Sequence, residues 1–199
     1  MARRPRSPPA APNEDAALLA ALTSFLAADK TLATTIAWVE DDGDFRFACS
    51  LDIVGLTAEG FTLFGRASAA LPDRKVTLGL RWQDPSGRGG NFDRLEWRPL
   101  KTHVNRANAP PDLRLRVIEG THHHPLARNA ALDSGLMRAI ADNLPVAEPL
   151  DPDPPDWPAL LRHAAALWRI EGLMTVPLPP WQYGLLPLIG GRQPQGDTP

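Results

Sequence analysis

Three consecutive histidines, His122, His123 and His124, are the residues of this chain best suited to chemistry. The sequence has only five histidines in 199 residues, and a fourth, His103, lies shortly before the run. Histidine changes its charge near neutral pH and is the commonest metal ligand in proteins. The run therefore indicates proton transfer or metal binding, and the elements that carry it must distinguish the two.

Strand geometry places two of these histidines beside charged partners. Apolar and polar side chains alternate on both sides of the loop Asn108–Pro111, which is the period of half-buried strands. If the two strands pair through this loop, Glu96 lies opposite His122 and Arg94 lies opposite His124. The sequence thus predicts a charged sheet face in which acidic, basic and imidazole groups meet.

The same alternation separates the central histidine from its neighbours. His123 is expected to point to the apolar side, where its replacement would mainly harm folding. Pro99 is expected to end or bulge the strand that precedes His103, because proline cannot donate to a sheet ladder. The face on which His103 lies therefore stays open.

The predicted polar face supports a phosphate site that needs neither a metal nor a cofactor. Arginines bind phosphate, and imidazole and carboxylate groups transfer protons near neutral pH. The candidate catalytic residues are His122, His124 and Glu96, and the candidate phosphate-binding residues are Arg94, Arg98, Arg114 and Arg116.

Three other interpretations remain open at the level of sequence. The first is a metal-dependent hydrolase that uses the His122-x-His124 step with Glu96 or His103, since such a step on a strand projects two imidazoles the same way. In the second, the run is a solvated strand end with no chemical role. In the third, the chain is a noncatalytic interaction module whose proline-rich and arginine-rich segments bind a protein.

Composition favours one globular domain. The chain is 43% hydrophobic with a net charge of −2, which argues against a dedicated nucleic-acid packaging protein. Its single cysteine excludes an intrachain disulfide and fits a reducing cytosol. No stretch approaches the length of a membrane span, so we expect a cytoplasmic protein with no membrane partner.

Hydrophobic periodicity predicts an α+β fold. We expect an N-terminal helix, an antiparallel meander of about six strands, two C-terminal helices and an extended proline-rich tail. The helices are expected at 14–28, 130–143 and 157–171, and the strands at 33–40, 44–54, 60–68, 75–83, 92–103 and 112–122. The domain would span 13–189, with disordered tails at 1–12 and 190–199.

Part of the polar face resembles a known family. The run Arg94-x-Glu96, His103-x-Asn105 and Gly120-Thr-His122-x-His124 is similar to the strand pattern of TumE-type toxins from bacterial toxin–antitoxin modules. The resemblance covers about 30 of the 199 residues. It implies an antitoxin partner and an RNA target, and with them a bacterial toxin-like ribonuclease.

Overall fold

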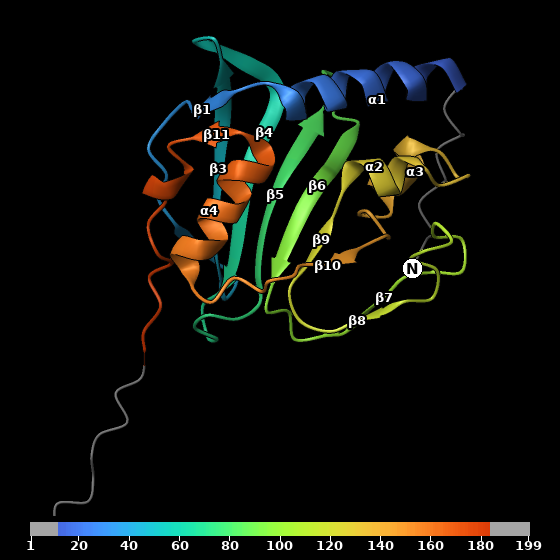
Figure 1. Cartoon of the computed structure of the whole chain (residues 1–199). Helices are drawn as coiled ribbons and strands as arrows, with labels where there is room; N and C mark the ends of the chain where they lie inside the picture. Colours follow the sequence, from blue (N-terminus) through green and yellow to red (C-terminus); the bar gives the residue numbers. More distant parts are fainter. Residues whose placement is uncertain (1–11, 184–199) are drawn as a thin grey trace, which may run out of the picture.

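The computed structural model describes residues 12–183 of the chain (Figure 1). In chain order, the elements of this part are α1 (Pro12–Ala27), β1 (Lys30–Leu32), β2 (Val39–Asp41), β3 (Asp44–Ile53), β4 (Leu56–Ser68), β5 (Val76–Gln83), β6 (Gly89–Trp97), β7 (His103–Val104), β8 (Val117–Ile118), β9 (His122–His124), α2 (Leu126–Ala130), α3 (Leu136–Ala141), β10 (Glu148–Pro149), α4 (Trp157–Trp168), β11 (Ile170–Glu171) and the 3-10 turn η1 (Leu173–Thr175).

One large sheet organises these elements, which confirms the predicted α+β class. Its strand order is β10-β9-β6-β5-β4-β3-β1-β11, with β2 paired to β3, and every pair is antiparallel except β1 with β11. The strands β3 to β6 form the predicted meander. A separate ribbon of β7 and β8 lies beside the end of the sheet that carries β9 and β10 (Figure 1).

The core covers one face of the sheet. The register aligns Phe47, Leu78 and Leu95 across three strands, and all are buried against residues from α1 and α4. Gly65 lies in the same row on β4, where a Cβ would lie 2.1 Å from the Phe47 ring. The aromatic ring therefore takes the space that a larger residue at this position would need.

The strands predicted at 33–40 and 112–122 are wrong in their extent. In the first, residues 33–38 form no strand, because β1 ends before them at Leu32 and β2 begins after them at Val39. In the second, Leu113 N and Arg116 N donate to the carbonyls of Pro110 and Leu113, so the segment turns instead of extending. The prolines favour this turn, and Leu113 is buried in a small second core with Ala139 of α3 and with Ala109, Leu132 and Val146.

Two further boundaries differ from the prediction. The strand expected at 92–103 ends at Trp97 and resumes as β7, because Arg98 adopts a left-handed φ of 47° ahead of Pro99. The helix expected at 130–143 is two short helices, α2 and α3, separated by a turn that reaches Gly135 at φ 85°. Both breaks are local backbone turns that side-chain periodicity does not encode.

The ends of the predicted domain are only partly visible. The tails predicted at 1–12 and 190–199 lie outside the described residues, apart from Pro12, where α1 begins. The proline-rich segment packs on the domain as far as it is described, since Trp181 is buried and its Nε1 donates to the Ser68 carbonyl at 2.7 Å. Among residues 12–183, no helix combines the length and hydropathy needed to cross a bilayer.

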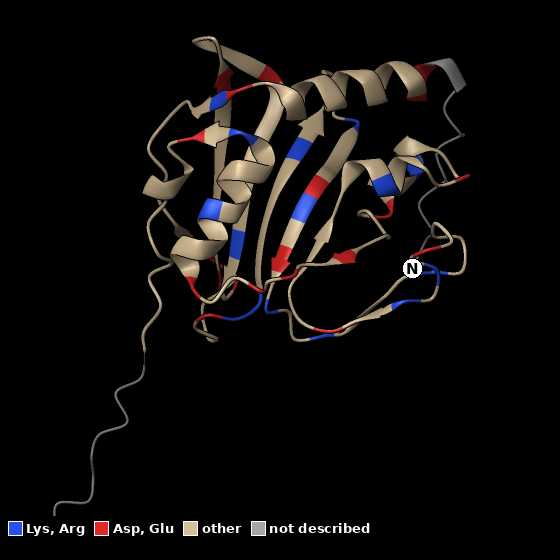
Figure 2. Cartoon of the chain, in the orientation of Figure 1, with Lys and Arg blue, Asp and Glu red and all other residues tan. Residues whose placement is uncertain are grey.

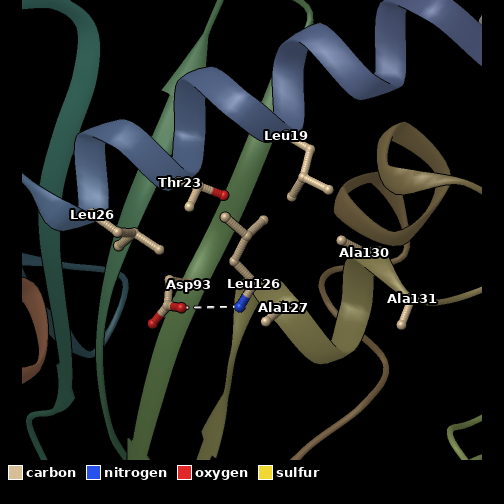
Figure 3. Close-up of a pocket in the computed structure, with 8 residues that line it drawn as sticks. All are labelled: Leu19, Thr23, Leu26, Asp93, Leu126, Ala127, Ala130 and Ala131. Atoms are coloured by element: carbon tan, nitrogen blue, oxygen red, sulfur yellow. Dashed lines mark hydrogen bonds between the residues drawn. The ribbon is translucent and has the colours of Figure 1, made fainter.

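A buried carboxylate joins the sheet to two helices. Asp93 on β6 accepts from His123 Nε2 at 2.6 Å, from Trp168 Nε1 at 2.8 Å and from Leu126 N at 3.0 Å. Figure 3 shows this carboxylate at the floor of an apolar cavity of about 440 Å³ between α1 and α2. Because each bond reaches a different element, Asp93 fixes β9, α4 and α2 against one strand.

We predict that Asp93→Asn lowers the free energy of unfolding by about 3 kcal/mol, because an amide cannot accept all three bonds and its NH₂ would face donors. Urea denaturation of the full chain measures this change. Asp133→Asn, at an exposed position, is the matched control and should leave stability unchanged. An Asp93→Asn variant as stable as the wild type would contradict the proposed role.

Candidate functional site

The pairing of β6 with β9 builds the first half of the site. Arg94 lies opposite His124 and Glu96 opposite His122, as the alternation predicted. In Figure 2, basic and acidic positions lie close together along β6. His123 is paired with Leu95 on the core face, so the prediction that it points away from its two neighbours is also confirmed.

A third histidine completes the group. His103 on β7 lies with its ring centroid 5.3 Å from that of His122 and 4.9 Å from that of His124. One ring nitrogen from each of the three residues lies within 4.8 Å of the other two. His122 and His124 have no solvent exposure, whereas His103 is half-buried. The break expected at Pro99 left the face of His103 open in the sequence, and the β7–β8 ribbon brings this residue into the cluster.

Main-chain and amide oxygens hold one nitrogen of each ring. His122 Nδ1 donates to the Gly120 carbonyl at 2.8 Å and His124 Nδ1 donates to the Leu144 carbonyl at 2.7 Å. His103 Nε2 donates to the Pro145 carbonyl at 3.2 Å and to an amide oxygen at 3.1 Å. A carbonyl can only accept, so these bonds fix the tautomer of each neutral ring and leave its other nitrogen as a lone-pair donor.

Three consecutive carbonyls, those of Asn143, Leu144 and Pro145, form a strap over the histidines. They accept in turn from Arg94 Nη2 at 3.0 Å, from His124 and from His103. Asn143 and Leu144 both adopt left-handed φ values, 57° and 58°, although neither is glycine. Such conformations cost about 1–2 kcal/mol per residue, so the surrounding structure must hold the strap in this shape.

Two buried asparagines hold the end of the strap. Asn105 donates to the Ala147 carbonyl and accepts from the Ala147 amide, both at 2.8 Å. Asn129 forms the same pair of bonds with Val146, both at 2.9 Å. Each amide side chain thus forms, with the backbone of one residue, the pair of hydrogen bonds that a neighbouring strand would otherwise form. The strap is therefore anchored to β7 on one side and to α2 on the other.

Glu96 and Arg94 carry the charges at the site. Burial alone would raise the pKa of Glu96, but nearby His122 and the Arg94 guanidinium outweigh it, so the pKa lies below its usual value. The carboxylate is consequently ionised at neutral pH. Arg94 Nη1 forms an ion pair with Glu96 Oε1, and Arg94 Nη2 donates to His124 Nε2 at 3.1 Å.

His122 Nε2 faces the carboxylate of Glu96. Its Nε2 lies 3.5 Å from Glu96 Oε2, and within residues 12–183 this nitrogen has no hydrogen-bond partner. In the neutral ring, whose proton lies on Nδ1, both facing atoms are acceptors, whereas a proton on Nε2 would be donated to the carboxylate. A buried polar atom without a partner costs about 1–3 kcal/mol, so a cation placed between these atoms would remove an unfavourable contact.

Burial also favours the uncharged form of the cluster. It lowers the pKa of His103, with the neighbouring His122 acting in the same direction. It lowers the pKa of His124 well below the usual value, and Arg94 adds to this effect. These two rings are therefore neutral near pH 7, which is the form that coordinates metal ions.

Three of the predicted phosphate-binding residues lie outside this group. Arg98 stacks over the Trp97 ring at 4.6 Å and donates to the Pro155 carbonyl at 2.8 Å. Arg114 and Arg116 are exposed on the turning segment before β8, because the strand that was to align them with His122 does not form there. Only Arg94 of the four predicted arginines reaches the histidines.

Sequence reasoning missed the residues that position the site. The strap lies well beyond the histidine run in sequence and carries no charge, and Asn105 was named only as part of the pattern His103-x-Asn105, without a role. The one available signal was polarity, since Asn105 and Asn129 lie among residues that pack in the second core. A buried asparagine must satisfy its amide, and backbone clamping is a common way to do so.

Comparisons with protein-family models, with curated proteins and with solved structures found no match for this chain.

The alternation on β9 predicts different outcomes for adjacent histidines. His123→Leu should lower the free energy of unfolding by about 2–3 kcal/mol, because it leaves the buried Asp93 carboxylate without its closest partner. His122→Leu should change it by less than about 1 kcal/mol, because the unpartnered Nε2 is lost together with the bond to Gly120. Urea denaturation in the presence of a chelator measures both, and equal losses would contradict the division of faces.

Proposed function

We propose that this chain binds one divalent transition-metal ion at His103, His122 and His124 and acts as a metal-dependent hydrolase. The observation that carries the proposal is the convergence of three imidazoles, with one ring nitrogen of each within 4.8 Å of the others and with each ring held by an oxygen acceptor. A hydrogen bond from one ring nitrogen to an oxygen acceptor is typical of metal-binding histidines, because it fixes the tautomer and the orientation of the ring.

The environment of the three histidines favours a metal ion over a proton as the cation that binds between them. The rings of His103 and His124 are neutral near pH 7, and the Glu96 carboxylate faces His122 Nε2. Together they favour a cation that accepts several lone pairs at once. Nitrogen ligands of a tetrahedral zinc ion lie about 3.3 Å apart, as the metal–nitrogen distances require. The ring nitrogens, which lie within 4.8 Å of one another, would therefore approach by up to about 1.5 Å on binding, through rotation of the rings.

The ligand set fits a catalytic centre better than a structural one. Imidazole ligands suit zinc, copper, nickel and iron, and three protein ligands leave a position for water or substrate. An ion held in this way lowers the pKa of a bound water to about 7. Glu96 is ionised, is partly exposed and lies beside His122, so its carboxylate can accept a proton from a nucleophilic water.

A second candidate is metal-free phosphate chemistry, the toxin-like, RNA-directed function that the TumE resemblance implies. Its support is that Arg94, Glu96, His122 and His124 share one face. Cytoplasmic location, bacterial origin and an antitoxin partner belong to this candidate. The complete burial of His122 and His124 favours the metal ion, because a bulky RNA backbone would have to contact both rings directly.

The proposal predicts about one zinc, nickel, manganese or cobalt ion per chain in untagged protein after gel filtration, measured by elemental analysis. The double variant His122→Ala/His124→Ala should bind none, because two of the three ligands are gone. His163→Ala, which removes a histidine from α4, is the control and should retain the ion.

Activity of the same three proteins separates the two candidates. A metal centre predicts that dialysis against a chelator abolishes hydrolysis of generic esters and that added metal restores it. Metal content well below one ion per chain in the wild type, with RNA decay that the chelator leaves unchanged, would exclude the metal centre and favour the toxin-like function.

A further inference from the structure

The Arg94 guanidinium lies where the ligands of the proposed ion meet. The side chain is only 8% exposed, Nη1 pairs with Glu96, and Nη2 donates both to His124 Nε2 and to the Asn143 carbonyl. His124 Nε2 is the lone-pair nitrogen of its ring, because Nδ1 is committed to the Leu144 carbonyl. In this arrangement the guanidinium supplies the positive charge among the lone pairs.

A metal ion and Arg94 cannot share His124. The Nε2 atom has one lone pair, and the lone pair can receive either the N–H of Arg94 or a metal ion. The ring cannot offer its other nitrogen without breaking a 2.7 Å bond to the strap. Binding of the ion at His124 therefore requires the guanidinium to withdraw from it.

Withdrawal leaves Arg94 with unused donors beside the ion. Within the described residues its Nε already lacks a partner, and Nη2 would lose His124. Arg94 is paired across the sheet with Gly79 on β5, which carries no side chain, and the apolar Phe64 ring lies over that glycine. A guanidinium with free donors next to a metal ion is a binding group for oxyanions, which it contacts through paired N–H bonds.

The charge of the loaded site selects the kind of oxyanion. A divalent ion, one guanidinium and the Glu96 carboxylate leave a net charge of about +2 when the histidines are neutral. A phosphate monoester carries about −1.5 to −2 at neutral pH and matches this charge, whereas a phosphodiester or a carboxylate carries only −1.

We infer that metal binding releases Arg94 from His124 and that the released guanidinium, together with the ion, binds the phosphate group of a phosphate monoester substrate. This inference rests on the proposed metal centre. Arg94 thereby has two positions: it occupies the ligands in the metal-free protein and contacts the substrate in the loaded protein.

The test uses the full chain, Co²⁺ as the metal and phenyl phosphate as the monoester. Cobalt absorption gives the Co²⁺ affinity, and calorimetry gives the affinity for phenyl phosphate with and without the metal. Arg94→Met removes the competing charge and its donors. Arg162→Gln is the control, because it removes one arginine charge at an exposed position on α4, away from the site.

Arg94→Met is expected to bind Co²⁺ about tenfold more tightly than the wild type, because both the competitor for His124 and a like charge are removed. It should bind phenyl phosphate at least about tenfold more weakly when loaded, because the paired N–H contacts are lost. The wild type should bind phenyl phosphate only when loaded, and Arg162→Gln should match it in both measurements.

Several results would overturn the inference. A wild type that binds no Co²⁺ would remove the metal centre and the inference with it. Equal Co²⁺ affinity in the wild type and Arg94→Met would keep the metal centre and remove the exchange. Phenyl phosphate binding to metal-free wild type, which needs no variant, would show that Arg94 is free without the ion. If the loaded wild type bound diphenyl phosphate or benzoate as tightly as phenyl phosphate, selectivity for a phosphate monoester would be excluded.

Discussion

The hydrogen-bonded pair of His123 and Asp93 is the interaction on which the rest of the site depends. It fixes the short strand β9 on β6 from the core face, at 2.6 Å, in a place where only three residues pair. Because side chains alternate along a strand, a slip of one position would move His122 and His124 into the core. One buried bond on the far side of the sheet therefore determines which imidazoles form the cluster. The helices α2 and α4 bind the same carboxylate, so the register is tied to the packing of both.

On the opposite face, the strap determines what the imidazoles can do. Its carbonyls accept the ring protons of His103 and His124, so the other nitrogen of each ring can only accept a hydrogen bond. Such an arrangement is unfavourable unless a cation or a donor is present. The backbone strain at Asn143 and Leu144 and the amide clamps at Asn105 and Asn129 maintain it. Ordinary peptide groups thus fix the tautomer of the rings of His103 and His124 before any ligand binds.

Much of the framework could be predicted from the sequence, because strand alternation is a local property. The helix at the N-terminus, the meander and the opposition of Arg94 to His124 and of Glu96 to His122 all follow from period-two patterns. Prediction failed where the chain turns for reasons that periodicity does not contain. The alternation predicted Leu113 in a strand, but this residue is buried in the second core on a segment that turns. Arg114 and Arg116, on the same segment, are therefore exposed and lie outside the site. His103 and the strap could not be placed, since both depend on contacts between residues about 40 positions apart.

The two edges of the sheet are closed by the latest strands to be synthesised. The meander is complete at Trp97, whereas β10 at Glu148–Pro149 and β11 at Ile170–Glu171 cover its flanks through β9 and β1. A chain emerging from the ribosome thus carries a nearly finished sheet with open edges for some 50 to 75 residues, the situation in which strands of different molecules pair. The histidines and the strap emerge during this interval, and their geometry exists only once β9 has docked. Docking of β9, which forms the site, therefore also covers one open edge of the sheet and prevents it from pairing with another molecule. Pro149 on β10 has no N–H to donate, so it blocks the addition of a further strand at that edge.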